Sequence, residues 1–379
     1  MKKQAFQNPF VVGKYISDEY FCDREKETDF LIRQIRNGRN TALISTRRMG
    51  KTGLIQHTFS TPDIRRNFHT FFVDIYSTGS LAEFVYLFGK AVYDELKPRW
   101  KVLQEKFFQT IKSLRAGFSL DPVTGEPKFE IGLGEIVSPQ TTLSEIFEYL
   151  EAADMPCVVA IDEFQQIGTY EEKNVEALLR TEIQKCKNTV FVFSGSKRHL
   201  MNNMFNSSSR PFYQSAISMG LEPIPLDIYK DFASSMFERF GRHIDIGVTE
   251  RVYRNYDGCT WFVQMMMNEL FALTEQGENC TEDKIPIAEH NVISVQENSF
   301  KDLLSRLAPK QKMLLQAVAR EGDAKGITSA EFVNKYRLSS ASSVQAAAKA
   351  LLKNDMLTHT DDTYRVYDYF FADWLRENF

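Results

Sequence analysis

Apolar residues form two kinds of run along the first two-thirds of the chain. Short runs rich in β-branched, aromatic and aliphatic residues are typical of buried strands. They occur at 41–45, 70–76, 157–162 and 189–195. The longer stretches between them place apolar residues at helical spacing, for example at 50–59, 80–115 and 171–187. Strands that alternate with helices predict an α/β domain built on a parallel sheet.

One stretch interrupts this alternation. Residues 116–134 contain two alternating apolar–polar runs on either side of the sequence DPVTG, whose proline and glycine favour a turn. We therefore predict a β-hairpin inserted into the α/β domain.

Two capping-box patterns predict helix starts. The sequence TLSE (142–145) is expected to open a helix that runs to Ala153, and TSAE (328–331) to open another in the C-terminal region. In both cases the threonine is the expected N-cap.

The strand pattern ends near residue 227. Helical segments fill 226–307, and a unit of three helices and an alternating hairpin follows, which is typical of a winged helix-turn-helix. We predict three domains. They are an α/β core at 1–222, a helical lid at 223–307 and a winged helix-turn-helix at 308–379. The core contains the hairpin predicted at about 116–134.

Composition narrows the class of protein. Hydrophobic residues make up 43% of the chain, enough for a sizeable core, and the formal net charge of −4 argues against a protein coated for nonspecific nucleic-acid binding. The five cysteines are far apart and show no metal-binding spacing. No signal peptide or membrane-spanning run is evident. We expect a cytoplasmic protein with reduced thiols and no membrane partner.

The segment STRRMGKT (45–52) joins the first predicted strand to the helix after it. It matches the P-loop pattern G-x-x-x-x-G-K-[ST], except that a serine replaces the first glycine. In such a loop, backbone N–H groups and the lysine hold phosphate, and the hydroxyl of the last residue binds Mg²⁺. The expected phosphate-binding residues are Ser45, Met49, Gly50, Lys51, Thr52 and Gly53, with Thr52 also on the metal. A chance match is the alternative for a motif this short.

Two carboxylates end the third predicted strand. Asp162 and Glu163 follow an apolar run, and buried acids at such a place are costly unless a cation lies nearby. We predict that Asp162 holds Mg²⁺ and that Glu163 activates the attacking water. The alternative is a pair that merely caps the next loop. The two motifs together favour an ATP site with Mg²⁺ as cofactor.

The fourth predicted strand ends in two serines, Ser194 and Ser196. In P-loop ATPases the strand beside the catalytic carboxylates often carries a polar sensor of the γ-phosphate, and Ser194 is our first choice for it. Two ordinary loop serines are the alternative.

These strand ends resemble the AAA+/STAND superfamily of P-loop ATPases, and more narrowly the archaeal-type ATPase family of archaea and bacteria. The resemblance extends over most of the chain, and the two Walker-type motifs are its most specific parts. The segments that carry it are FCDREKETDFL (21–31), ISTRRMGKTGLI (44–55), VVAIDEFQQI (158–167), FVFSGSKRHLM (191–201), RPFYQSA (210–216) and the C-terminal APKQKMLLQAVARE and YRVYDYFFADWLRE.

The resemblance implies further site residues. It places the segment containing Phe21 and Arg24 near the adenine, and it gives Arg210 a contact with the γ-phosphate, from its own or a neighbouring subunit. A surface or helix-cap role is the alternative for Arg210. Arg47 and Arg48 would neutralise phosphate or bind a partner domain over the site.

The predicted winged helix raises the question of whether this domain binds DNA. Residues 309–379 hold ten Lys and Arg against nine Asp and Glu, and the wing tip carries Asp361 and Asp362. A DNA reader needs a higher density of positive charge. We expect this domain to pack on the ATPase or to bind a protein, and DNA is the alternative.

The favoured function is a Mg²⁺-dependent ATPase that binds ATP between core and lid and works as a slow switch, alone or as an oligomer. The alternative is a winged-helix, DNA-associated regulator in which nucleotide is structural. A small-molecule P-loop kinase needs an arginine-rich lid, and the arginines of 226–307 are scattered.

Overall fold

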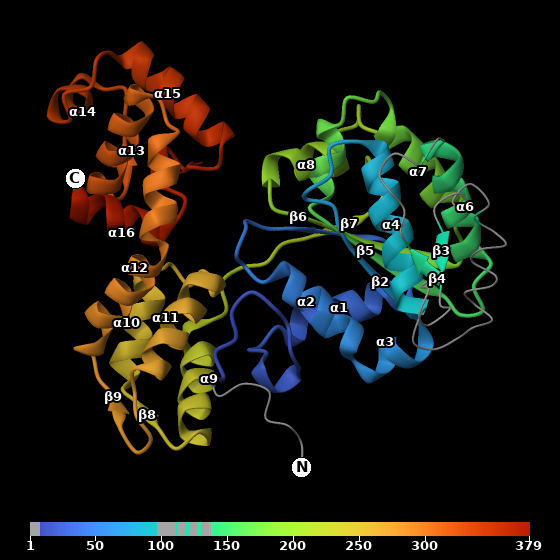
Figure 1. Cartoon of the computed structure of the whole chain (residues 1–379), viewed down its shortest axis with the longest axis horizontal. Helices are drawn as coiled ribbons and strands as arrows, with labels where there is room; N and C mark the ends of the chain where they lie inside the picture. The colour runs from blue at the N-terminus through green and yellow to red at the C-terminus, as the bar shows by residue number, and fades with distance from the viewer. Residues whose placement is uncertain (1–7, 97–110, 112–117, 121–126, 130–135, 137) are drawn as a thin grey trace. The chain divides into compact units, whose positions relative to one another are not determined.

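The structure is a computed structural model that describes residues 8–96, 111, 118–120, 127–129, 136 and 138–379. The chain divides into two compact units, which Figure 1 shows in one view. We call Gly13–Ile224 the α/β unit. The N-terminal stretch up to Val12 joins Pro225–Phe379 in the other, which we call the C-terminal unit.

The α/β unit is built on a five-stranded parallel sheet with the order β2-β5-β6-β1-β7. This order is typical of P-loop proteins, and the predicted fold class is confirmed. Residues of β5 and β6 are buried along their whole length, as expected of central parallel strands. The strands are β1 (Thr41–Ile44), β2 (His69–Asp74), β5 (Cys157–Asp162), β6 (Thr189–Gly195) and β7 (Ile217–Met219).

Helices cover both faces of the sheet. Figure 1 shows α4, α6 and α7 on one side and α1, α2 and α3 on the other. One large apolar cluster lies under the first group, where rings such as Phe147, Phe191 and Phe193 stack. The helices are α1 (Glu25–Arg36), α2 (Lys51–Ser60), α3 (Pro62–Asn67), α4 (Leu81–Leu96), α6 (Pro139–Glu151), α7 (Val175–Lys185) and α8 (Arg198–Asn206), with 3₁₀ turns at Asp18–Tyr20 and Phe164–Thr169.

Both capping-box predictions were wrong, because neither Thr142 nor Thr328 is the N-cap of its helix. Helix α6 begins at Pro139 with Ser138 as N-cap, and Thr142 bonds back to the Ser138 carbonyl within the first turn. In the C-terminal region Ser329, not Thr328, is the N-cap, and its side chain accepts a hydrogen bond from the Phe332 N–H.

The predicted hairpin is only partly described. Strands β3 (Phe118–Leu120) and β4 (Pro127–Phe129) pair antiparallel, as expected, while the turn at 121–126 lies outside the described residues. The helix expected at 80–115 is described as α4 up to Leu96, and 97–110 also lie outside them.

The C-terminal unit begins with a helical region. Its helices are α9 (Leu226–Arg239), α10 (Ile246–Asn255), α11 (Thr260–Ala272) and α12 (Lys284–Ser305). Two short parallel strands, β8 (His243–Ile244) and β9 (Asn279–Cys280), lie in this region, where the sequence pattern indicated helices alone. Phe10 is fully buried here among Phe232, Phe237 and Phe271, which fixes the N-terminal stretch to this unit.

The last part of the chain has the predicted three helices and wing. They are α13 (Pro309–Glu321), α14 (Ala330–Lys335), α15 (Ala341–Lys353) and a small sheet of β10 (Ala324–Lys325), β12 (Thr363–Val366) and β11 (Leu357–Thr360). Helix α16 (Tyr369–Asn378) buries Phe370, Phe371 and Trp374. Among the residues that the structure describes, no helix is long and apolar enough to cross a bilayer.

Candidate functional site

The predicted phosphate loop lies between β1 and α2. Gly50 caps α2 with φ +91°, a conformation that favours glycine, and a Cβ there would meet no atom within 4 Å. The loop is therefore open at this point. Lys51 is buried, and its Nζ donates to the carbonyls of Ser45 and Thr46, 2.9 Å away in each case. The first turn of α2 and the loop thus bring one ammonium and several N–H groups together, as an anion requires.

The serine at the first loop position fits its place. Ser45 is buried, its Oγ donates to the Leu221 carbonyl at 2.9 Å, and its φ is not positive. Glycine's conformational freedom is not needed there. The residue of the loop besides Gly50 that takes a positive φ is Arg48, at +69°. The loop keeps its shape with serine because the hydroxyl has its own acceptor.

Thr52 and Asp162 meet directly. The Thr52 Oγ1 donates to Asp162 Oδ2 at 2.6 Å, although 110 residues separate them in sequence. The contact forms because β5 ends at Asp162 on the same edge of the sheet at which α2 begins. A hydroxyl and a carboxylate in contact are the protein ligands that Mg²⁺ commonly takes beside a phosphate.

Glu163 follows with a left-handed backbone, φ +55°. Its Oε2 accepts hydrogen bonds from Gln165 Nε2 and from Ser196 Oγ, the latter at 2.6 Å. Arg47 of the loop in turn donates through Nε to Ser196 Oγ at 3.3 Å, and its guanidinium lies 5.1 Å from the centre of the Tyr76 ring. The carboxylate is thus connected through Ser196 to the phosphate loop.

Ser194 has a different setting from Ser196. It is fully buried, and its Oγ has no hydrogen-bond partner among the described residues. On neighbouring strands, Ser194 and Asp162 come one residue after the paired Phe193 and Ile161. An unpaired buried hydroxyl beside the strand ends is compatible with a polar ligand, so Ser194 stays a predicted sensor.

The segment before α1 reaches the loop. The Arg24 guanidinium donates to Met49 O at 3.4 Å and to Glu27 at 2.8 Å, and the residue is 4% exposed. The Phe21 ring stacks on His57 of α2, with 4.3 Å between ring centres, and a Cβ at Gly53 would lie 3.5 Å from it. Both predicted adenine-contact residues therefore adjoin the loop and α2.

The described contacts of Arg210 do not connect it to the phosphate loop, Asp162 or Glu163. It forms an ion pair with Glu176 of α7, and its Nε is buried with no hydrogen-bond partner among the residues that the structure describes. Burial raises the pKa of Glu176, and the charge of Arg210 opposes that rise. A contact between Arg210 and phosphate would require this pair to open, and that contact stays a prediction.

The sequence reasoning missed Asp74. It ends β2 and lies opposite Asp162 in the sheet register. Asp74 is an exposed residue whose carboxyl is partly withdrawn from water. This partial burial raises its pKa most, and the charges of Asp162 and Glu163 add to the rise, while a hydrogen bond from the Tyr76 N–H opposes it. The signal was available, because the carboxyl ends of parallel strands share one edge and β2 ends in an acid.

We expect Asp74→Asn to raise the melting temperature of the nucleotide-free protein at neutral pH. A carboxyl whose pKa is raised in the folded state costs stability when ionised, and asparagine keeps the acceptor for Tyr76. The gain should shrink as the pH falls through that raised pKa and vanish below the unfolded value. Melting curves across pH measure it. The exposed Asp29→Asn is the control; equal shifts in both variants would contradict the interpretation.

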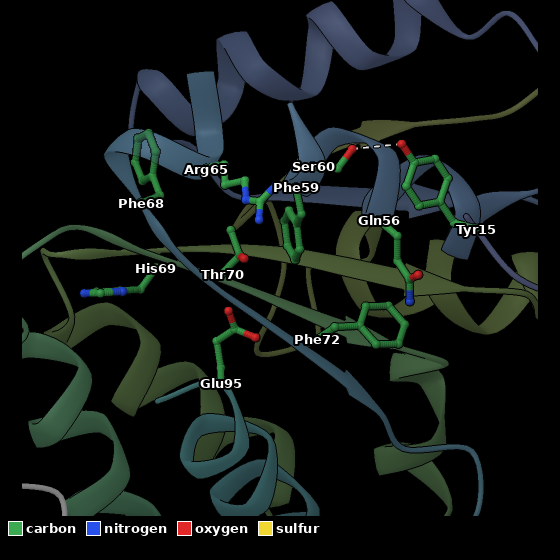
Figure 2. Close-up of a pocket in the computed structure, with 10 residues that line it drawn as sticks. All are labelled: Tyr15, Gln56, Phe59, Ser60, Arg65, Phe68, His69, Thr70, Phe72 and Glu95. Atoms are coloured by element: carbon green, nitrogen blue, oxygen red, sulfur yellow. Dashed lines mark hydrogen bonds between the residues drawn. The ribbon is translucent and has the colours of Figure 1, made fainter. Parts of the chain in front are cut away.

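A separate hollow of about 350 Å³ opens near the start of β2. Figure 2 shows it between aromatic rings such as Phe59 and Phe72, with the Tyr15–Ser60 hydrogen bond at its rim. None of the predicted site residues lines it. It is therefore distinct from the site formed by the phosphate loop and the residues at the ends of β5 and β6, which we call the strand-end site.

Comparison with known proteins agrees with this fold. The Walker-type ATPase PABY2304 of Pyrococcus abyssi is similar in structure, with a TM-score of 0.67, 19% identity, and 97% of this chain and 99% of that chain covered. This chain has a P-loop ATPase fold. Residues 298–377 match a family model described as a "probable winged helix domain", and no curated protein sequence matches. The predicted resemblance is thus confirmed for the fold and the C-terminal winged helix.

Two further structures share the arrangement at lower identity. The ORC2 protein of Aeropyrum pernix, solved in ADPNP–ADP complexes, gives a TM-score of 0.61 at 14% identity, with 97% of this chain and 95% of that chain covered. The ORC1 protein of the same organism, solved with DNA, gives 0.51 at 11% identity, with 94% and 93% covered. At these identities the likeness establishes the fold.

The residues present fit Mg²⁺ with a phosphate ligand. Mg²⁺ usually takes one or two carboxylates, a hydroxyl and phosphate oxygens, and it does not need a cage of protein groups. The Thr52–Asp162 contact supplies such a pair, and the part of the chain that the structure describes contains no cluster of three or more His, Cys, Asp or Glu suited to a metal. The donor set favours a metal shared with a nucleotide.

Proposed function

We propose that this protein binds Mg-ATP at the strand-end site and hydrolyses it to ADP and phosphate, slowly, as a conformational switch. The fold supports the proposal, and so does the complex of a protein of similar fold with ADPNP and ADP. The single observation that carries it is the contact of Thr52 with Asp162 beside the buried Lys51.

Each residue has a role that follows from its place. Lys51 would exchange its two loop carbonyls for phosphate oxygens, since an ammonium gains more from a charged acceptor. Thr52 and Asp162 would hold Mg²⁺, which neutralises charge on the β- and γ-phosphates when bound. Glu163 would take a proton from the attacking water through its second carboxylate oxygen. Phe21 and Arg24 would contact the adenine side of the nucleotide.

Binding is tested by thermal melting. Mg-ATP at about 100 times its dissociation constant should stabilise the protein by about 2.7 kcal/mol, because a ligand that binds only the folded state shifts unfolding by mass action. ATP without Mg²⁺ should give a smaller shift, and GTP in parallel measures the choice of base. Phosphate release over hours completes the test. The absence of both a melting shift and phosphate release would refute the proposal.

The winged helix has a second candidate role in DNA binding. The family match favours it, and the ORC1 relative was solved with DNA. The charges oppose it, because Arg365 of the wing is already paired with Asp323 and Asp257. We therefore propose a protein partner for this domain, with an oligomer also compatible.

DNA binding is decided by its salt dependence. A DNA reader should lose affinity steeply as salt rises, since each neutralised phosphate releases counterions. We expect only weak binding of a duplex at low salt, measured by fluorescence anisotropy. Strong binding that persists at physiological salt would favour the DNA-associated regulator instead.

A further inference from the structure

The carboxylate of Glu163 is held at one end only. Its Oε2 accepts two hydrogen bonds, from Gln165 Nε2 and Ser196 Oγ, while Oε1 has no partner among the described residues. Two donors on one oxygen fix the plane of the group and leave the other oxygen available. This is the arrangement expected of a base that must meet a water at a defined place.

Ser196 supplies the connection between this base and the phosphate loop. A hydroxyl has one proton, and Arg47 Nε–H already donates to Ser196 Oγ, so the serine proton is directed to Glu163. Ser196 is 8% exposed, which limits competition from water. The hydrogen bonds therefore run in one direction, from Arg47 through Ser196 to the carboxylate.

Gly195 explains how Ser196 comes this close. A Cβ at residue 195 would lie 2.4 Å from Gln165 Oε1 and 2.5 Å from two atoms of Met201. The end of β6 can approach the 3₁₀ turn Phe164–Thr169 because this residue has no side chain. The close approach also places Gln165 beside the carboxylate, so Gly195 sets the position of both donors.

We propose that Ser196, oriented by Arg47, is the positioning residue for the Glu163 carboxylate, and that Gln165 is its second support. The inference rests on the proposed ATPase function and adds to it a structural link between the phosphate loop and the base. Ser196 acts through Glu163 and does not itself contact the nucleotide. Ser194, chosen from the sequence as the sensor, has no part in this link.

The test is a comparison of steady-state ATP hydrolysis by the full chain and its variants. Ser196→Ala should lower kcat by about 10-fold, because a base that is free to turn spends less time in place, and should leave KM within about twofold. Ser196→Thr retains the hydroxyl and should recover most of the loss. Ser218→Ala, an exposed serine of β7 in the same sheet, is the matched control and should not change kcat.

A double variant separates positioning from a general structural effect. If Ser196 acts only through Glu163, adding Ser196→Ala to Glu163→Gln should change single-turnover hydrolysis by less than about twofold. An independent effect of Ser196 would lower the rate again and overturn the inference. So would a Ser196→Ala enzyme with wild-type kcat, while the proposed ATPase function would stand. A wild-type protein without hydrolysis would overturn both.

Discussion

Glu163→Gln is expected to lower the rate of ATP hydrolysis by about 10²–10⁴-fold, the usual contribution of a general base, and to leave ATP affinity unchanged. Glutamine has nearly the same shape and can still accept hydrogen bonds from Ser196 and Gln165, but it cannot take a proton from water. Thr52, Asp162 and Lys51 remain in place to bind the nucleotide. Single-turnover phosphate release and a nucleotide melting shift measure the two quantities separately.

The control for this variant is Glu171→Gln, an exposed glutamate in the same segment of the chain. It should hydrolyse ATP at the wild-type rate. If Glu163→Gln retained more than about a tenth of the wild-type rate, another group would have to activate the water. Arg210 is not a substitute, because its guanidinium is a permanent cation.

Lys51→Ala is expected to weaken Mg-ATP binding by about 100-fold, the loss of one or two charge-assisted hydrogen bonds to phosphate. The Lys51 ammonium is buried where the loop meets α2, and in this structure it donates to the Ser45 and Thr46 carbonyls. The measurement is the nucleotide melting shift across ATP concentrations.

Lys51→Ala also leaves two loop carbonyls without their donor, so the variant's own melting temperature has to be recorded without nucleotide. Lys173→Ala, an exposed lysine elsewhere in the α/β unit, controls for the loss of one positive charge. A folded Lys51→Ala protein that binds and hydrolyses Mg-ATP normally would contradict the assignment of the site.

The sheet was predictable because its central strands are buried on both faces. Residues 157–162 and 189–195 are continuous apolar runs, and β5 and β6 occupy these ranges. Strand β7 escaped notice because it is three residues long and includes the exposed Ser218. Helix α3 does not show in the apolar pattern, because it is only six residues long and begins with Pro62, a residue that can end a helix but is also favoured in the first turn of one.

The site was predictable as far as short motifs reach. Lys51, Thr52, Asp162 and Glu163 were predicted because each lies within a sequence pattern whose chemistry is known, and the structure brings Thr52 and Asp162 into contact. Asp74, Gln165 and Ser196 belong to the same region only through strand register and side-chain direction. Between two serines that are two positions apart, the sequence cannot show which one meets a carboxylate and which is buried in the sheet.

The burial of Phe10 has a topological consequence. Because residues up to Val12 belong to the C-terminal unit and Gly13–Ile224 do not, the polypeptide crosses between the units twice, at 12–13 and at 224–225. A single proteolytic cut at 224–225 would therefore leave Pro225–Phe379 attached to the rest of the chain only by the noncovalent packing around Phe10.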